Sequence, residues 1–204
     1  MVPVVRRAEP AERCAVLATV VAAFARDPAW AFILGGAYER LAPRFAGALF
    51  DARVACGTVW VSDDLAAVAM WDPLDPDDDA IRRAEAARHS YRAAAGEAAA
   101  ERLTLYNRAV ATATPDERHW YLGVLATHPD HRRRGLASAV IAPVIADADV
   151  RGIACGLETS TAANRAFYRH RGFTEATDVV LPGGPPTWWL RRPPVVTDAA
   201  VLLR

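Results

Sequence analysis

The sequence contains no lysine, and all 24 of its basic residues are arginine. Asp and Glu also number 24, so the net charge is zero. A protein whose main task is to grip nucleic acid carries a basic excess, so we expect no nucleic acid among the partners. Cysteine is scarce too: Cys14, Cys56 and Cys155 lie far apart, with no Cys-x-x-Cys or Cys/His pairing. This predicts a reducing, cytoplasmic location, no disulfide framework, no metal site and three buried, inert thiols.

Long apolar runs are also missing. No stretch approaches the ~18 continuous apolar residues of a membrane span. The N-terminus lacks a basic stretch followed by an apolar run, so we expect neither a signal peptide nor a membrane partner. Two phosphate-binding patterns, GxxxxGK(S/T) and GxGxxG, are absent as well. What is present is a 204-residue chain that is 52% apolar, which is enough for one sizeable core.

Strand-like and helix-like patterns alternate along the chain. Strands are expected at 2–7, 118–129, 152–159, 173–181 and 186–192, a hairpin at 57–71, and helices at 10–24, 39–54, 80–112 (one or two), 134–150 and 162–170. "RDPAW" and "LGG" are expected to interrupt the helical pattern after Phe24. Residues 118–129 are apolar on both faces, which is typical of a central strand. The order predicts an α+β fold with a β-α-β-α unit in its C-terminal half.

The stretch "HPDHRRRGLASAV", residues 128–140, combines three arginines and a glycine at the start of an expected helix. A helix N-terminus has unpaired amide N–H groups and a partial positive charge, which favour a bound phosphate. Arginine suits phosphate geometry, and Gly135 leaves room for a ligand to touch the backbone. Pro143 is expected to kink this helix near Ala139. A solvated basic turn without a ligand is the alternative interpretation.

The same residues carry a family resemblance. Arg132-x-x-Gly135-x-Ala137 is similar to the R/Q-x-x-G-x-G/A signature with which GNAT acetyltransferases bind the pyrophosphate of acetyl-coenzyme A. "HWYLGVLATHPDH", "GLETSTAANRAFYRHRGF" and "DVVLPGGPPTWWLRR" resemble the puromycin N-acetyltransferase group of that superfamily, and weaker similarity extends to "AAFARDP" and residues 57–71. The resemblance implies one GNAT domain over 1–204, with a mixed, mostly antiparallel central sheet flanked by helices. Acceptor-binding elements are expected mainly in 1–112, the acetyl-CoA-binding core in 118–192, and a tail in 193–204.

The resemblance also implies which residues contact acetyl-CoA. In the matched family, backbone groups of the strand before the loop bond the pantetheine amides, the loop holds the pyrophosphate, and an asparagine contacts the pantetheine arm. On this sequence the candidate contacts are Leu125, Ala126, Thr127, Arg132, Arg133, Arg134, Gly135, Leu136, Ala137, Ser138, Asn164 and Phe167.

Two residues are candidates for the chemistry. Tyr168 lies four residues after Asn164, so both share one helix face, and the matching tyrosine of the family is the general acid that protonates the leaving thiolate. The alternative for Tyr168 is packing beside Phe167. Glu158 ends a strand and could accept a proton from the amine or anchor its charged form; it could instead cap the 162–170 helix. His119 and Tyr121 are further candidates for a proton relay or base.

These observations together predict an acetyl-CoA-dependent N-acetyltransferase. The expected partner is the primary amine of a small molecule, such as an aminonucleoside antibiotic of the puromycin type, which would give antibiotic resistance. A peptide or protein N-terminus is an alternative acceptor that the acidic stretch "DPLDPDDD" could serve. A coenzyme-binding sensor without turnover is a second alternative. We expect a monomer or a homodimer.

Overall fold

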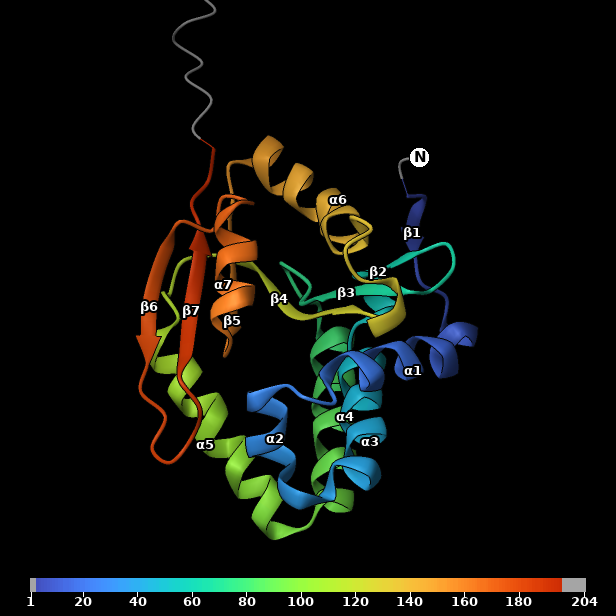
Figure 1. Cartoon of the computed structure of the whole chain (residues 1–204), viewed down its shortest axis with the longest axis vertical. Coiled ribbons are helices and arrows are strands. Elements are labelled where there is room, and N and C mark those ends of the chain that lie inside the picture. Colours follow the sequence, from blue (N-terminus) through green and yellow to red (C-terminus); the bar gives the residue numbers. More distant parts are fainter. Residues whose placement is uncertain (1–2, 196–204) are drawn as a thin grey trace, which may run out of the picture.

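A computed structural model describes residues 3–195, which form a seven-stranded sheet with helices on both faces (Figure 1). The strand order is β1-β2-β3-β4-β5-β7-β6, and every pair is antiparallel except β4 with β5. The strands are β1 (Val5–Arg7), β2 (Val59–Ser62), β3 (Ala67–Trp71), β4 (His119–Thr127), β5 (Ala154–Thr159), β6 (Glu175–Val179) and β7 (Thr187–Arg192). This mixed, mostly antiparallel sheet confirms the predicted fold class, and β4 is central as its apolar faces predict.

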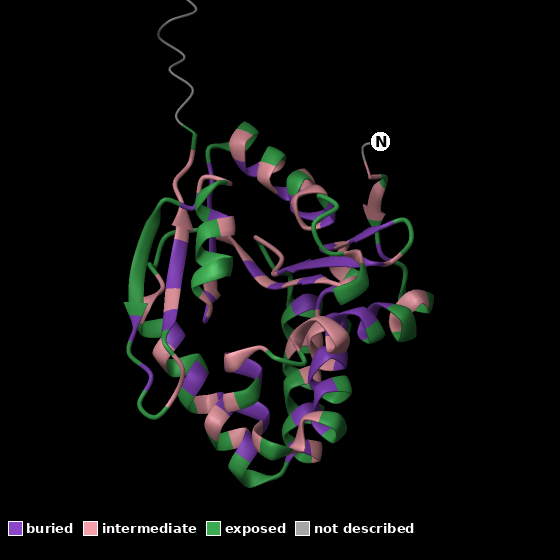
Figure 2. Ribbon diagram, in the orientation of Figure 1, coloured by how far each residue is buried: buried purple, intermediate pink, exposed green. Residues whose placement is uncertain are grey.

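Seven α-helices accompany the sheet in the described part of the chain. They are α1 (Arg13–Phe24), α2 (Pro28–Leu34), α3 (Tyr38–Asp51), α4 (Asp78–Ala95), α5 (Glu97–Ala113), α6 (Leu136–Arg151) and α7 (Ala162–Arg169). The first five contribute to one hydrophobic core, whereas α6 and α7 contribute to a second core on the other face. Strand alternation divides β3 between the two cores: Val68 and Met70 face the first, and Ala67, Ala69 and Trp71 face the second. Figure 2 shows this burial along the strands and on the inner sides of the helices.

A β-bulge in β4 shapes the middle of the sheet. The register with β3 changes from Met70↔Val124 to Trp71↔Leu122. Leu122 packs in the second core and Val124 in the first, although residues two apart on a regular strand share a face. On its other side β4 pairs with β5 only from His119 to Tyr121. Beyond Tyr121, therefore, β4 and β5 part and leave a gap inside the sheet.

The sequence missed one helix and misjudged two cysteines. Asp27, in the expected break "RDPAW", accepts a hydrogen bond from the N–H of Trp30 and caps α2, with Pro28 at its first position. The expectation of three buried thiols is wrong, because Cys14 is exposed and Cys56 is only half-buried. Cys155 is buried, and none of the three forms a disulfide. The tail expected at 193–204 lies outside the described residues from 196 onward.

Within residues 3–195 no single helix is both long and apolar enough to cross a membrane. A bent pair, 10–24 with 28–56 at 105°, satisfies those criteria by length and composition alone, and many of its apolar residues lie in the first core.

Candidate active site

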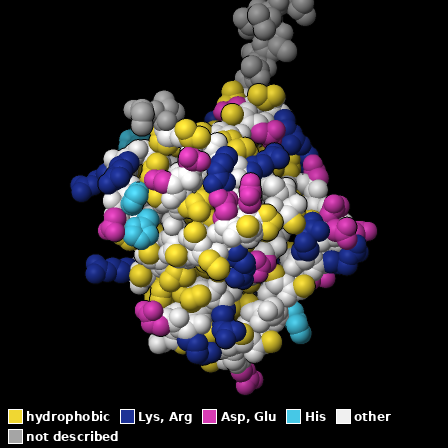
Figure 3. Space-filling view, turned by 90° about the vertical axis from the view of Figure 1, so that its right-hand side faces the viewer, with side chains coloured by type: hydrophobic (Ala, Val, Ile, Leu, Met, Phe, Trp, Pro, Cys, Tyr) yellow, Lys and Arg dark blue, Asp and Glu magenta, His cyan; other side chains and the backbone are white. Residues whose placement is uncertain are grey.

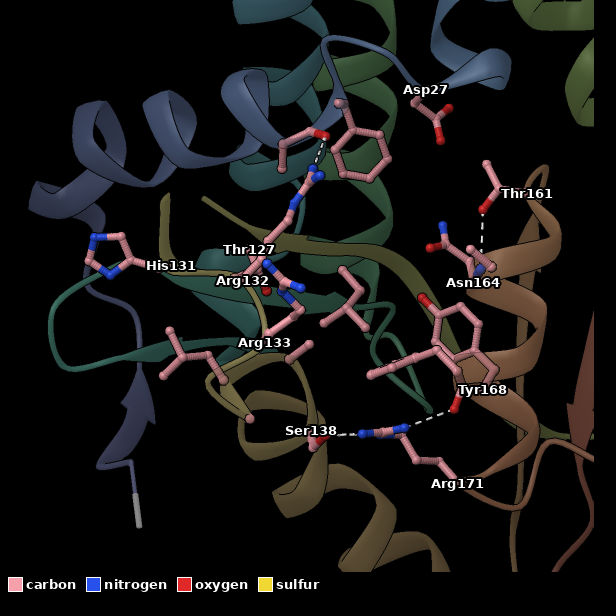
Figure 4. A pocket seen from close by; sticks show the side chains of 18 of the residues that line it. Asp27, Thr127, His131, Arg132, Arg133, Ser138, Thr161, Asn164, Tyr168 and Arg171 are labelled. Atoms are coloured by element: carbon pink, nitrogen blue, oxygen red, sulfur yellow. Dashed lines mark hydrogen bonds between the residues drawn. The ribbon is translucent and has the colours of Figure 1, made fainter. Parts of the chain in front are cut away.

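A cleft of about 650 Å³ lies between the start of α6 and the exposed face of α7 (Figure 4). We call it the main cleft. Its floor is the gap that opens where β4 leaves β5, and its far wall is the α1–α2 connection at Phe24 to Asp27. In Figure 4, Arg132 and Arg133 face Asn164 and Tyr168 across the cavity. The loop before α6 and helix α7 therefore line the same cleft, although the sequence analysis identified the two segments separately.

The loop before α6 has the backbone of a ligand cradle. Gly135 caps the helix with φ +78°, and a Cβ placed there would meet nothing within 4 Å. Arg133 also has a positive φ, of 62°, which is uncommon for a residue with a side chain. Such strain gathers at ligand-binding loops, where the surrounding structure holds it in place. The first amides of α6 and the arginines of this loop thus lie beside an open space suited to a phosphate group.

Charge in the main cleft is strongly one-sided. Arg26, Arg132, Arg133 and Arg171 line it, with Asp27 as its only acidic lining residue. Arg132 also donates a hydrogen bond to the carbonyl of Ala23, which ties the loop to the end of α1. Such a cavity favours an anionic ligand.

The open side of β4 supplies free backbone groups. The N–H of His128 bonds to the carbonyl of Ala66 on β3. Because alternate residues of a strand point to opposite neighbours, the N–H and C=O groups of Leu125 and Thr127 point away from β3, toward the gap. Both residues line the main cleft. An extended ligand with amide groups can bond to this edge as an added strand does.

Most of the predicted coenzyme contacts come together here. Leu125, Thr127, Arg132, Arg133, Gly135, Leu136, Ala137, Ser138, Asn164, Phe167 and Tyr168 all line the main cleft. Two predicted contacts do not. Ala126 is buried in the first core, because its side chain points to the opposite face from Leu125. Arg134 is exposed and donates instead to the carbonyl of Asp130.

Tyr168 lies where the main cleft meets a second cavity. This second cavity, the inner chamber, has a volume of about 130 Å³ and shares Phe24, Asp27, Leu125, Asn164 and Tyr168 with the cleft. Burial, together with the charge of Glu158, raises the pKa of Tyr168, so the phenol stays protonated. Its ring is nevertheless packed edge-on against Phe167 and Phe173, as the alternative interpretation expected. The residue therefore combines a packed ring with a protonated hydroxyl at the junction.

Glu158 lies in the wall of the inner chamber, not at a helix cap. Thr161 caps α7 by accepting from the N–H of Asn164, so the capping role considered for Glu158 belongs to Thr161. Glu158 accepts hydrogen bonds from the hydroxyls of Tyr121 at 2.6 Å and Tyr106 at 3.4 Å. Burial raises the pKa of Glu158 to about 7 in spite of these two donors. A carboxylate poised near neutral pH is suited to accept a proton.

A third cavity, of about 420 Å³, opens on the other side of Glu158. We call it the outer cavity. Asp72, Asp116 and Glu158 line it, without an arginine. His119, the other base candidate, also lines it, with Nδ1 2.7 Å from the carbonyl of Glu117. Asp72 is paired at 2.6 Å with Arg53, which lines the inner chamber, so Asp116 and Glu158 are the carboxylates that give the outer cavity an acidic lining in contrast to the main cleft.

Several residues of these cavities were not predicted from the sequence. Asp27 enters through the missed helix, although "AAFARDP" belongs to the resembling stretches. Tyr106 belongs to a helical pattern that gave no hint of which residue meets Glu158. Arg171 directly follows the expected 162–170 helix. Its guanidinium lies 3.5 Å from the ring centre of Phe167 and donates from Nε to Ser138 at 3.0 Å, so it joins α7 to α6.

Comparison with protein families adds to this geometry. Residues 64–173 match the acetyltransferase (GNAT) family, over more than half of the chain and across the loop, the gap and α7. The chain belongs to this family. The matched residues of this GNAT protein include the Arg132–Ala137 loop.

Solved structures agree with the assignment at the level of the fold. An acetyltransferase from Corynebacterium glutamicum, described as a histone acetyltransferase HPA2 and related acetyltransferase, is 24% identical, with a TM-score of 0.62 over 97% of this chain and 99% of that one. A polyamine N-acetyltransferase from Drosophila melanogaster, which forms N-acetylagmatine, is 16% identical with a TM-score of 0.62, over 92% and 98%. An N-acetyltransferase from Staphylococcus aureus is 12% identical with a TM-score of 0.59, over 92% and 99%.

Two other kinds of site were expected to be absent from this GNAT protein, a metal centre and a nucleic-acid surface. Among the described residues, no group of three or more His, Cys, Asp or Glu side chains could hold a metal ion. On the face shown in Figure 3, arginines and acidic side chains are interspersed and do not form a broad basic stripe.

Proposed function

We propose that this GNAT protein transfers an acetyl group from acetyl-CoA to the primary amine of a small molecule. The observation that carries the proposal is Glu158, a half-buried carboxylate with a pKa raised to about 7. It lies in the wall of the inner chamber, which adjoins the arginine-lined main cleft, and it also lines the outer cavity, whose lining has carboxylates and no arginine. An anionic co-substrate suits the main cleft and a cationic amine suits the outer cavity.

The main cleft fits acetyl-CoA on three counts. Arg132 and Arg133, with the α6 amides beyond the positive-φ Gly135, suit the pyrophosphate. The backbone edge at Leu125 and Thr127 suits the two amides of the pantetheine arm. Asn164 and Phe167, on α7, line the opposite wall. Bound acetyl-CoA would supply an activated thioester carbonyl at the junction with the inner chamber.

Two side chains would move the protons. Glu158 accepts a proton from the ammonium group, which leaves a neutral amine able to attack the thioester carbon. As the new N–C bond forms and the C–S bond breaks, Tyr168 donates its proton to the departing sulfur, and the second proton that the nitrogen loses on becoming an amide restores the phenol of Tyr168. A positioned acid or base contributes about 10²–10⁴-fold to such a reaction.

The acceptor class follows from the outer cavity and from the fold relatives. The cavity walls carry carboxylates, which suit an organic cation. Small amines are the acceptors named for the Drosophila fold relative. Within this class we propose an aminonucleoside antibiotic of the puromycin type as a candidate acceptor, acetylated in the cytoplasm by a monomer or homodimer, and that candidate rests on the motif resemblance.

Much of the acidic stretch "DPLDPDDD" is used within the structure, although its first residue, Asp72, lines the outer cavity and is paired there with Arg53 at 2.6 Å. Asp75 pairs with Arg118 and lies 3.8 Å from Arg151, and Asp77 caps α4 through the N–H of Ala80. Neither side chain lines the main cleft, the inner chamber or the outer cavity. Both carboxylates are thus used within the structure.

A panel of primary amines, incubated with acetyl-CoA and read by mass spectrometry, tests the proposal. The expected product is one acetyl group heavier than the amine, with release of free thiol. Glu158→Gln is the matched variant, since it keeps the shape and loses the base. Acetylation of puromycin would support the finer candidate, and acetylation of other amines alone would limit the proposal to the reaction class. A wild-type protein that binds acetyl-CoA and acetylates none of the panel would contradict the proposed enzyme and favour a sensor.

A further inference from the structure

The inner chamber and the outer cavity meet at a thin wall. Four residues line both cavities and so separate them: Tyr106, Asn107, Tyr121 and Glu158. Two of the four, Tyr106 and Tyr121, place their hydroxyls on the same carboxylate. An amine that approaches Glu158 from the outer cavity must therefore pass between these two rings or displace one of them.

Tyr121 is held firmly in this wall. Its ring stacks on Trp189, with ring centres 5.8 Å apart and planes within 7° of each other. Trp189 itself is tightly placed, because a Cβ on Gly156 would lie 2.3 Å from its ring. The hydroxyl of Tyr121 donates to Glu158 at 2.6 Å, a short hydrogen bond. Movement of Tyr121 would disturb all of these contacts.

Tyr106 forms the other side of this wall. It projects from α5, outside the sheet, and its hydroxyl reaches Glu158 at 3.4 Å, near the limit for a hydrogen bond. Within residues 3–195 its ring forms none of the aromatic contacts that fix Tyr121, and it is held instead by packing in the first core, where it is 6% exposed. Of the two phenols, Tyr106 is the one with the weaker bond to Glu158.

The volumes of the two cavities determine which part of an acceptor can reach Glu158. The inner chamber measures about 130 Å³ and the outer cavity about 420 Å³. Cavities that enclose a drug-sized ligand measure about 300–1,000 Å³. The inner chamber therefore suits an amine group and its nearest carbons, and the body of a larger acceptor has to remain in the outer cavity.

We propose that Tyr106 is the residue that determines which acceptors reach Glu158. Its ring limits the width of the passage between the outer cavity and the inner chamber, while Tyr121 remains fixed as the opposite side. Primary amines whose carbons next to the nitrogen form a linear chain pass beside Tyr106. Primary amines branched at the carbon next to the nitrogen are excluded unless the ring of Tyr106 moves. This role rests on the proposed function, because it assumes that the amine meets the coenzyme at Glu158.

Three substitutions of Tyr106 separate the effect of the width of the passage from the effect of the hydrogen bond to Glu158. Tyr106→Phe keeps the ring and removes only the bond to Glu158. Tyr106→Ala opens the passage, and Tyr106→Trp narrows it. Phe50→Ala is the matched control for lost packing, because Phe50 is as deeply buried and is absent from the walls of all three cavities.

The measurement is the affinity of each variant, loaded with free coenzyme A, for a linear and an α-branched primary amine of equal carbon number. Calorimetry on this non-reactive complex does not depend on acetyl transfer. We expect the branched-to-linear affinity ratio to rise about tenfold or more in Tyr106→Ala, in line with the effect of one methylene in a tight pocket. The ratio should fall in Tyr106→Trp and stay the same in Tyr106→Phe and Phe50→Ala.

An unchanged ratio in both Tyr106→Ala and Tyr106→Trp would overturn the proposal, as would an equal rise in Phe50→Ala. If Tyr106→Ala fails to fold, the fall predicted for Tyr106→Trp decides the matter alone. Amines that bind with the predicted ratios but are not acetylated by the wild-type protein with acetyl-CoA would contradict the proposed enzyme and leave the passage supported. The two failures are thus distinguishable.

Discussion

The hydroxyl of Tyr121 lies 2.6 Å from Oε2 of Glu158, and both side chains belong to the wall between the inner chamber and the outer cavity. The phenol donates to the charged form of the carboxylate and so lowers its pKa, whereas burial raises it to about 7. The protonation of Glu158 near neutral pH is therefore set by the balance between burial and this contact.

The first prediction concerns the pH dependence of acetylation. Because Glu158 must be ionised to accept a proton, kcat/KM should rise with pH through about 7 and level off above it. Tyr121→Phe removes the donor, so the rise should move to higher pH. Tyr91→Phe is the control, since the hydroxyl of Tyr91 is also buried but has no partner. A pH profile that is unchanged in Tyr121→Phe would remove Glu158 from the role of base.

The second prediction concerns stability. The folded-state pKa of Glu158 is raised from 4.5 to about 7, so between these values the folded chain holds a proton that the unfolded chain has released. The free energy of unfolding should therefore fall as pH rises from 4.5 to 7, by an amount on the order of 3 kcal/mol at most. Glu158→Gln should lack this fall. Urea unfolding at pH 5 and pH 8 measures the difference, and equal slopes in both proteins would contradict the raised pKa.

The third prediction concerns Tyr168. Tyr168→Phe removes one oxygen and keeps the ring that packs against Phe167 and Phe173. Turnover should drop by ~10²-fold or more, while the free energy of unfolding changes by about 1 kcal/mol or less. Affinity for acetyl-CoA should stay nearly the same. The loss should be smaller with an acyl donor whose leaving thiol is more acidic, because such a thiol needs less help from an acid.

The control for Tyr168→Phe is the comparison of acyl donors whose leaving thiols differ in acidity. A purely structural tyrosine would lower turnover equally for every donor, in step with the fraction of folded protein. Normal kcat in a stable Tyr168→Phe protein would end the assignment of the general acid, and His119 and Tyr121 would be examined next.

The fourth prediction compares the two ends of α6. Gly135 before the helix and Gly152 after it both have a positive φ, of 78° and 61°, and a Cβ at either would meet no atom within 4 Å. Alanine at either position should cost about 1–3 kcal/mol of backbone strain. Only Gly135 lines the main cleft, so only Gly135→Ala should also weaken acetyl-CoA binding, measured by calorimetry. Equal affinities in the two variants would favour the interpretation of residues 131–135 as a solvated turn.

The sequence was most informative where one local rule decides the structure. Two β-prone runs on either side of a turn predicted the hairpin at 57–71, and the apolar faces of 118–129 predicted a central strand. The role of Asp27 was missed because "RDPAW" satisfies two rules at once: Pro28 ends one helix pattern and also begins the next helix. The loop before α6 and α7 were selected by the GNAT resemblance, and the structure places both at one cleft.

What the sequence could not provide was contact across the sheet. Tyr106 and Glu158 are 52 residues apart, and no spacing rule joins α5 to β5. The direction of the Ala126 side chain depends on the β4 bulge, which shifts the alternation between Leu122 and Val124. The raised pKa of Glu158 results from burial by several elements together, so it too is a property of the assembled fold.

The parting of β4 and β5 places a free strand edge in the middle of a sheet. Exposed strand edges invite other chains to pair with them and so promote aggregation, and proteins protect them with charges, bulges or covering segments. Here the edge at Leu125 and Thr127 is recessed between α6, α7 and the α1–α2 connection. A polypeptide strand with bulky side chains meets these walls, whereas a slender unbranched chain with amide groups does not. The fold thus keeps free backbone hydrogen-bonding groups, like those of an edge strand, in a place where another polypeptide chain cannot pair with them and cause aggregation.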